Sequence, residues 1–147
     1  LDVLINNASM FYPTPLEQAQ QLDWDELFNS NVRAAFFLCR SLSSELKSRS
    51  GCIINIVDAH ADRCLRNHPI YNMAKSALKS MTKSLALDLK DKGVGVLITD
   101  HNVRETMGLI DRAVLIHEGS VLIEGKPEDI IKNDDVRRVY LGERFSI

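Results

Sequence analysis

Apolar positions recur along the chain in two rhythms, and these predict alternating strands and helices. Short apolar runs predict strands at 2–6, 52–57 and 94–99. Apolar residues at helical spacing predict helices over 23–48, 69–91 and 102–110. Strands separated by helices favour right-handed crossovers and a parallel sheet. The expected fold class is therefore α/β, a fragment of a three-layer, Rossmann-like parallel sheet.

The last third of the chain has a different pattern, which predicts a hairpin and short helices. Apolar runs at 113–117 and 121–124, separated by Glu118-Gly119-Ser120, predict a hairpin that extends the sheet in the antiparallel sense. Helices are expected near 127–132, where Pro127 suits a first turn, and over 134–141. Because no Pro/Gly/Ser-rich linker or repeat interrupts the chain, residues 1–147 are expected to form one fused α/β domain.

Tyr71 and Lys75 are the first candidates for chemistry, because they lie one helical turn apart. A free phenol has a pKa of about 10. A cation at position i+4 favours the phenolate, so the spacing predicts an acid catalyst whose pKa is lowered toward neutrality. The same spacing is also common on ordinary solvated helices. The pair alone therefore does not identify a site.

Polar residues at strand ends and on one helix face add to this pair. Asn6 and Asn7 close the first apolar run and Asp58 closes the second, at the strand ends where open α/β sheets place their sites. Asn31 interrupts the apolar face of the helix at 23–48, and a buried Asn needs a partner. Taken one by one, each has a structural alternative. Asn7 and Asp58 would be turn or cap residues, Phe11 ordinary core, and Asn31 bonded to backbone.

These residues together resemble the short-chain dehydrogenase/reductase family, and within it the pteridine reductases, over about residues 1–89. Asn6-Asn7-Ala8 resembles the family's motif after its fourth strand, Asn31 its helix Asn, and Tyr71 and Lys75 its Tyr-x-x-x-Lys. Asp58 stands where most members carry Ser, as in pteridine reductases. The resemblance implies NADPH-dependent reduction of a dihydropterin or dihydrofolate.

The same resemblance implies a role for each matching residue. Proton transfer would fall to Tyr71, Lys75, Asp58 and Asn31. The cofactor would contact Asn7, Ala8 and Ser9, together with Tyr71 and Lys75. The substrate would lie against Phe11 and Asp58, with the Phe11 ring stacked on the pterin ring.

From about residue 90 to 147 the chain resembles another family, the ATP-binding subunits of ABC transporters and most closely the lipopolysaccharide-export ATPase. The segments that carry the resemblance are Asp111-Arg-Ala-Val-Leu-Ile-His-Glu-Gly119, Glu124-Gly-Lys-Pro-Glu-Asp-Ile130 and Val136-Arg-Arg-Val-Tyr-Leu-Gly-Glu-Arg144. His101 resembles by position the family's switch histidine, which touches the γ-phosphate of ATP. Its alternative is a helix-start residue capped by Asp100 or Asn102, and we favour that interpretation. Transporter membrane subunits as partners follow only from this resemblance.

Neither parent's phosphate-binding motif occurs in these 147 residues. Gly93-Val-Gly95 precedes its strand instead of following it, and no Gly-x-x-x-x-Gly-Lys-Ser/Thr is present. The sequence therefore predicts a recombined chain, joined within the helix at 69–91, without the full activity of either parent. NADPH is expected only by resemblance, and ATP binding is not expected. A residual dihydropterin or dihydrofolate reductase, an ATP-binding component of lipopolysaccharide export, and a folded module without catalysis are the alternatives.

Composition and charge limit the partners. The net charge is −2 with 26% charged residues and no basic stripe, which does not favour nucleic acid. No apolar run is long enough to span a bilayer, so membrane insertion is not expected. The three cysteines lack metal-site spacing, which predicts a reduced cytoplasmic environment and no metal site. A homo-oligomer is expected through the helices at 23–48 and 69–91, whose apolar side chains a short sheet leaves uncovered: Phe36, Phe37, Leu78, Met81 and Leu85.

Overall fold

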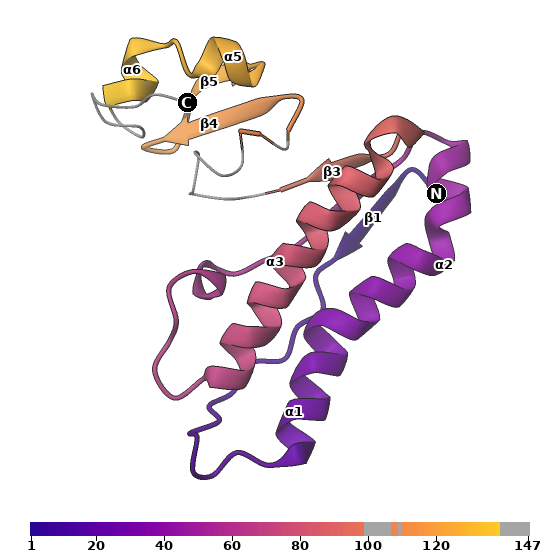
Figure 1. The fold of residues 1–147 in the computed structure, drawn as a ribbon, viewed down its shortest axis with the longest axis vertical. Helices are drawn as coiled ribbons and strands as arrows, with labels where there is room; N and C mark the ends of the chain where they lie inside the picture. Colours follow the sequence, from indigo (N-terminus) through magenta and orange to yellow (C-terminus); the bar gives the residue numbers. More distant parts are fainter. Residues whose placement is uncertain (99–106, 109, 139–147) are drawn as a thin grey trace. The chain divides into compact units, whose positions relative to one another are not determined.

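A computed structural model describes residues 1–98, 107–108 and 110–138 of the chain. The chain divides into two compact units, Leu1–Thr99 and Asp100–Ile147, where the sequence predicts a single fused domain. Figure 1 shows the elements of each unit along the colour gradient of the sequence. Most of the helix predicted at 102–110 lies outside the described residues, and so does His101.

The first unit is built on a parallel sheet. Strands β1 (Val3–Asn6), β2 (Cys52–Asn55) and β3 (Gly95–Leu97) pair in the order β1-β2-β3, and all neighbours are parallel. The register places Asn6 of β1 beside Asn55 of β2. The predicted parallel α/β sheet is therefore confirmed, with strands somewhat shorter than the apolar runs suggested.

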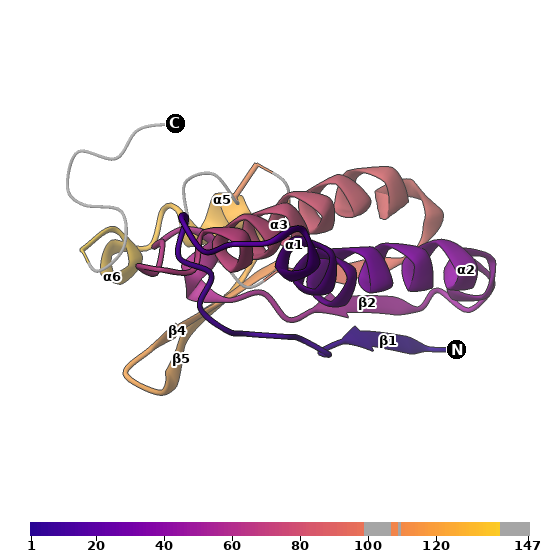
Figure 2. The ribbon, with the colours of Figure 1, turned by 90° about the horizontal axis from the view of Figure 1, so that it is seen from below.

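Helices connect these strands and cover one face of the sheet. The segment predicted as one helix at 23–48 consists of α1 (Gln21–Phe28), a π-helix (Asn29–Arg33) and α2 (Ala34–Ser48). Helix α3 (Pro69–Leu89) begins with Pro at its first turn and continues into a 3-10 helix (Lys90–Lys92). In Figure 2 the three α-helices lie on the same side of β1 and β2. Among the described residues, no helix is both long and apolar enough to cross a membrane.

The core of this unit lies between the sheet and the helices. It is formed by Cys39, Leu46, Ile53, Leu89 and Val94, and a second buried cluster of Leu27, Ile70 and Tyr71 joins α1 to α3. Inward and outward positions alternate along the strands, so the opposite face of the sheet shows exposed apolar side chains such as Val3, Ile5 and Leu97.

The helix side chains expected to be uncovered divide into two groups. Phe36 and Phe37 on α2 are exposed, as expected. Leu78 is only 2% exposed, so the expectation that it would be uncovered is wrong. Helix α3 turns this side chain inward. Met81 and Leu85 are half-buried.

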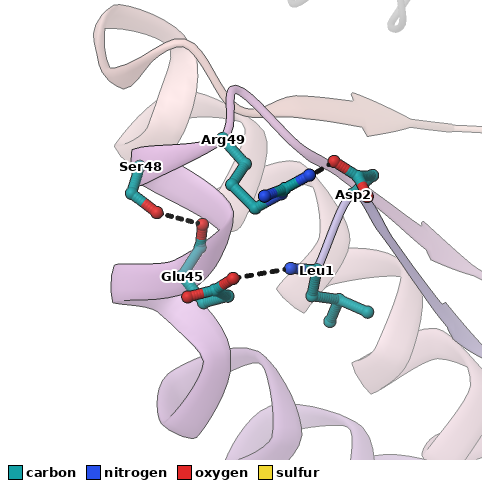
Figure 3. Close-up of polar contacts among 5 residues, drawn as sticks. All are labelled: Leu1, Asp2, Glu45, Ser48 and Arg49. Carbon is teal, nitrogen blue, oxygen red and sulfur yellow. Dashed lines mark hydrogen bonds and ion pairs between the residues drawn. The ribbon is translucent and has the colours of Figure 1, made fainter.

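The connection from α2 to β2 is compact. A Cβ at Gly51 would lie 2.9 Å from Leu46 Cδ2 and 3.0 Å from the Asp2 carbonyl oxygen, so a larger residue would require the Leu46 side chain and the backbone at Asp2 to shift. In Figure 3, the Arg49 guanidinium reaches Asp2 at 2.9 Å and the Leu1 amino group reaches Glu45 at 2.7 Å. These exposed ion pairs link the end of α2 to the start of β1.

The second unit contains a separate antiparallel hairpin. Strands β4 (Ala113–His117) and β5 (Ser120–Gly125) form their own two-stranded sheet, followed by α5 (Pro127–Ile130) and α6 (Asp134–Val136). Glu118 and Gly119 both have positive φ, as a tight hairpin turn requires. The hairpin therefore does not extend the parallel sheet as predicted. It packs instead into a core of its own, formed by Met107, Leu115, Ile130 and Val136.

Candidate active site

Tyr71 and Asp58 form the shortest polar contact of the candidate site. Tyr71 lies in the first turn of α3, and Asp58 follows β2 and precedes a 3-10 helix (Ala59–Ala61). The phenol donates to Asp58 Oδ2 at 2.6 Å, while Asp58 Oδ1 accepts from the His60 backbone N–H at 2.9 Å. The second bond is a cap interaction, so Asp58 has both the structural role considered from the sequence and a contact with Tyr71.

This contact reverses the predicted tuning of Tyr71. Burial and then the hydrogen bond and negative charge of Asp58 raise the pKa of Tyr71 above its ordinary value. The prediction that Lys75 lowers this pKa toward neutrality is therefore wrong. The Lys75 ammonium lies 5.8 Å from the centroid of the Tyr71 ring, and its hydrogen bond goes to the Ile56 carbonyl at 3.2 Å.

The other two ionisable groups of the site shift in the opposite sense. Lys75 is only 4% exposed, and this burial lowers the pKa of its ammonium group, although the negative charge of Asp58 partly opposes the shift. Burial alone would raise the pKa of Asp58, but hydrogen bonds from Tyr71 and from the His60 N–H outweigh it and lower the pKa. Near neutral pH the site therefore contains a protonated phenol bound to an ionised carboxylate.

Asn31 links the π-helix to the loop after β1. Its Nδ2 donates to the carbonyl oxygens of Leu27 and Met10, both at 2.9 Å, and its Oδ1 accepts from Ser9 Oγ at 2.6 Å. The buried amide therefore has the partners that it needs, two of them backbone groups, as the structural alternative proposed. The residues before Ser9 in this loop, Asn7 and Ala8, are exposed.

Phe11 lies on the same loop and contacts the start of α3. Its ring stacks on His68 with centroids 4.8 Å apart and planes 8° apart, and it meets Tyr71 edge-on, also at 4.8 Å. Phe11 is 55% exposed, which does not fit ordinary core. The Thr14 N–H donates to the Asn67 carbonyl at 2.7 Å, so backbone also joins this loop to the segment before α3.

A chain of two amides and a hydroxyl that the sequence reasoning missed fixes the strand ends to α3. Asn6 Nδ2 donates to Asn55 Oδ1 at 2.8 Å, and Asn55 Nδ2 donates to Thr82 Oγ1 at 2.9 Å. Thr82 in turn donates to the Leu78 carbonyl at 2.7 Å. We call Asn6, Asn55 and Thr82 the amide clamp. The available signal was that Asn55 and Thr82 are polar residues at inward positions of an apolar strand and an apolar helix face.

The candidate site lies at the carboxyl edge of the parallel sheet. A Tyr, a Lys and a carboxylate gather there, after β2 and at the start of α3, in the position where open, Rossmann-like α/β sheets place their sites. Among the described residues, no group of three or more His, Cys, Asp or Glu could hold a metal ion.

The family model of the short chain dehydrogenases matches residues 1–107, and the chain belongs to that family. A putative NAD(P) dependent gluconate 5-dehydrogenase from Beutenbergia cavernae, solved with bound NADP, is 32% identical, with a TM-score of 0.63 over 65% of this chain and 39% of its own. The L-sorbose reductase from Gluconobacter frateurii, solved with NADPH and L-sorbose, is 31% identical, with a TM-score of 0.61 over 63% of this chain and 36% of its own.

Another part of the chain is similar to ABC transporter ATP-binding proteins. It is 62% identical over 65 residues to a probable ABC transporter ATP-binding protein of Azorhizobium caulinodans, and the matched segment covers 44% of this chain and 23% of that protein. It is 54% identical over 63 residues to the lipopolysaccharide export system ATP-binding protein LptB of Acidithiobacillus ferridurans, covering 43% of this chain and 26% of that protein. The chain thus spans about a quarter of the curated relatives it matches. The predicted resemblance to two families is confirmed.

Proposed function

We propose that the chain carries the catalytic segment of an NADPH-dependent pteridine reductase, joined within α3 to the final segment of a lipopolysaccharide-export ATP-binding protein. On this proposal the 147 residues do not carry out the full activity of either parent. The short chain dehydrogenase match covers 107 residues and the match to the ABC transporter ATP-binding protein covers 65, together 25 more than the 147 residues of the chain. The two similarities therefore share at least 25 residues. Such an overlap supports a join at an element type that both families supply.

The Tyr71–Asp58 contact is the observation that supports reductase chemistry. Reduction of a ring C=N bond adds hydride to carbon and a proton to nitrogen. When bound, the nicotinamide cofactor would supply the hydride. Tyr71 holds a proton in a buried site, and the Asp58 contact keeps that proton on the phenol until a basic substrate atom approaches. Lys75 supplies positive charge on the same helix face, which would stabilise the phenolate that forms on transfer.

The residues around this contact fit the nicotinamide end of a dinucleotide. Asn7 and Ala8 are exposed in the loop that follows β1, at the carboxyl edge of a parallel sheet where such cofactors bind. Ser9 is held by Asn31, so the loop has a fixed partner. We assign the cofactor to Asn7, Ala8, Ser9, Tyr71 and Lys75, with NADPH as the preferred form because of the resemblance to pteridine reductases.

The substrate assignment rests on Phe11 and Asp58. An exposed aromatic ring and a carboxylate, each in contact with Tyr71, suit a flat heterocycle that stacks on the ring and donates hydrogen bonds through amino and N–H groups. A dihydropterin has both features. Dihydrofolate carries the same bicyclic ring and is the second substrate of the proposed class.

Two measurements test this proposal. Quenching of biopterin fluorescence should report binding by the wild type that Phe11→Ala weakens. Mixed with NADPH and dihydrobiopterin, the chain should show no turnover above a Tyr71→Phe control, because these 147 residues lack the Gly-rich loop that would hold the phosphates of NADPH. A positioned acid contributes only about 10²–10⁴-fold and needs a bound hydride donor. NADPH-dependent loss of dihydrobiopterin that disappears in Tyr71→Phe would instead identify a residual reductase. Absence of biopterin binding would reject the substrate class.

A further inference from the structure

His68 lies against the ring that the proposed function assigns to the substrate. Its imidazole is almost parallel to Phe11, at 4.8 Å and 8°, whereas Tyr71 meets the same ring at 74°. Near-parallel stacking is the arrangement that a bound flat heterocycle would adopt on Phe11. One side chain of the protein thus already occupies stacking surface of this ring.

Local hydrogen bonds hold His68 in that position. Its Nδ1 lies 2.8 Å from the Arg66 carbonyl oxygen, and because a carbonyl only accepts, Nδ1 carries the proton in this contact. The preceding residue, Asn67, has a φ of 62° and its carbonyl accepts from the Thr14 N–H. Since the backbone on both sides of the stack is tied together, the imidazole would leave Phe11 by rotation of its own side chain.

We propose that the His68 ring occludes the substrate subsite: it competes with the substrate ring for the stacking surface of Phe11, and a ligand must displace it to bind there. This rests on the proposed function, which places a dihydropterin on Phe11. An imidazole has one small ring, so a bicyclic heterocycle that also bonds to Asp58 gains more from Phe11 than His68 does. Because the competing contact belongs to the protein itself, it lowers the affinity of every ligand that must displace it by the same factor. His68 therefore weakens binding on Phe11 without changing the preference between ring sizes.

The test compares His68→Ala with His68→Phe. The Ala variant frees the surface, and the Phe variant keeps a competing ring without the Nδ1 hydrogen bond. The His68 side chain makes no capping hydrogen bond to α3, so truncation leaves the start of that helix intact. We expect His68→Ala to bind biopterin roughly two- to tenfold more tightly than the wild type, the range that one aromatic pair supplies. His68→Phe should bind no more tightly than the wild type.

The same variants should shift the affinity of every ligand that stacks on Phe11 by one factor. A monocyclic aminopyrimidine should gain the same factor as biopterin in His68→Ala, because both displace the same imidazole from Phe11. In proton NMR spectra, the ring signals of His68 should move toward those of a free histidine both in Phe11→Ala and on addition of biopterin to the wild type.

The outcomes separate this inference from the proposed function. Biopterin binding that is lost in Phe11→Ala but unchanged or weaker in His68→Ala would overturn competition by His68 and leave the substrate class standing. His68 ring signals that do not respond to Phe11→Ala would overturn the inference without any ligand. Absence of biopterin binding by both the wild type and His68→Ala would overturn both.

Discussion

Thr14 and Thr82 allow the same substitution to be made in two opposite environments. Both are buried, at 2% and 1% exposure, and both belong to the first unit. Thr82 Oγ1 accepts from Asn55 and donates to the Leu78 carbonyl. Within the described residues, Thr14 Oγ1 has no hydrogen-bond partner. Replacement by Val keeps the branched shape and removes the hydroxyl, so the two variants compare a satisfied hydroxyl with an unsatisfied one.

The expected changes in the free energy of unfolding have opposite signs. Thr82→Val leaves the buried Asn55 amide without its acceptor, and an orphaned buried donor costs about 1–3 kcal/mol. Thr14→Val removes a polar group whose burial without a partner costs roughly 1–3 kcal/mol. The Thr82 variant should therefore be less stable than the wild type by at least about 1 kcal/mol, and the Thr14 variant equally or more stable.

Trp24 provides the assay. It is the single tryptophan of the chain and lies in α1, stacked on Phe28 at 4.3 Å, so its fluorescence follows unfolding of the first unit. Urea titrations of both variants and the wild type give three midpoints to compare. For a unit of this size, about 1 kcal/mol corresponds to a shift in Tm of roughly 4–8 °C, which thermal unfolding resolves.

Two results would refute the reasoning. Equal destabilisation by both substitutions would mean that the Thr14 hydroxyl is satisfied after all. An unchanged midpoint for Thr82→Val would mean that the amide clamp adds nothing to stability. A matched loss in Asn55→Leu and Thr82→Val, with no further loss in the double variant, would support the clamp as one unit.

Three further predictions concern ionisation, association and nucleotide. Ultraviolet titration should show Tyr71 ionising above its ordinary pKa near 10, and Asp58→Asn should lower the pKa of Tyr71. Because the pKa of Tyr71 is higher in the folded state than in the unfolded state, the stability that the raised pKa adds is complete below about pH 10 and is lost as pH rises through the folded pKa. Sedimentation at tens of micromolar should show a dimer or larger species that Phe37→Asp on α2 dissociates and Ile5→Asp on the open sheet face does not, whereas a clean 16.6 kDa species would refute association. Calorimetry should show the same ATP affinity for His101→Ala as for the wild type, and micromolar binding weakened by that change would contradict this.

The order of strands and helices in the first unit could be predicted because periodicity reflects which side of an element is buried. The same pattern could not identify what covers that side. Leu78 has helical apolar spacing whether α3 packs against its own chain or a second copy, and only the structure shows it buried. The hairpin was likewise recognisable from its turn, but no local signal states whether a strand pairs with the neighbouring sheet or forms its own.

At the candidate site, residue types were predictable and their electrostatics were not. The spacing of Tyr71 and Lys75 is a property of one helix, and it suggested that the cation controls the phenol. The deciding charge is Asp58, 13 residues away in sequence, whose carboxylate oxygen is 2.6 Å from the Tyr71 oxygen. Similarly, the need of Asn31 for partners followed from burial, but Ser9 and Met10 became its partners only through the path of the loop after β1.

The π-helix at Asn29–Arg33 sets the angular phase between α1 and α2. Leu27, Asn31, Ala35 and Cys39 follow one another at intervals of four residues, and all are buried. In a regular α-helix each such interval turns the side chain about 40° past the previous one, so the four would not share one face. The wider turn absorbs one extra residue and brings Cys39 back to the side of Leu27. Deleting any one residue between 29 and 33 would therefore rotate α2 by about 100° against α1. Either Leu27 with Asn31 or Cys39 with Leu46 would then face water, so the length of this segment constrains the fold as strongly as its composition does.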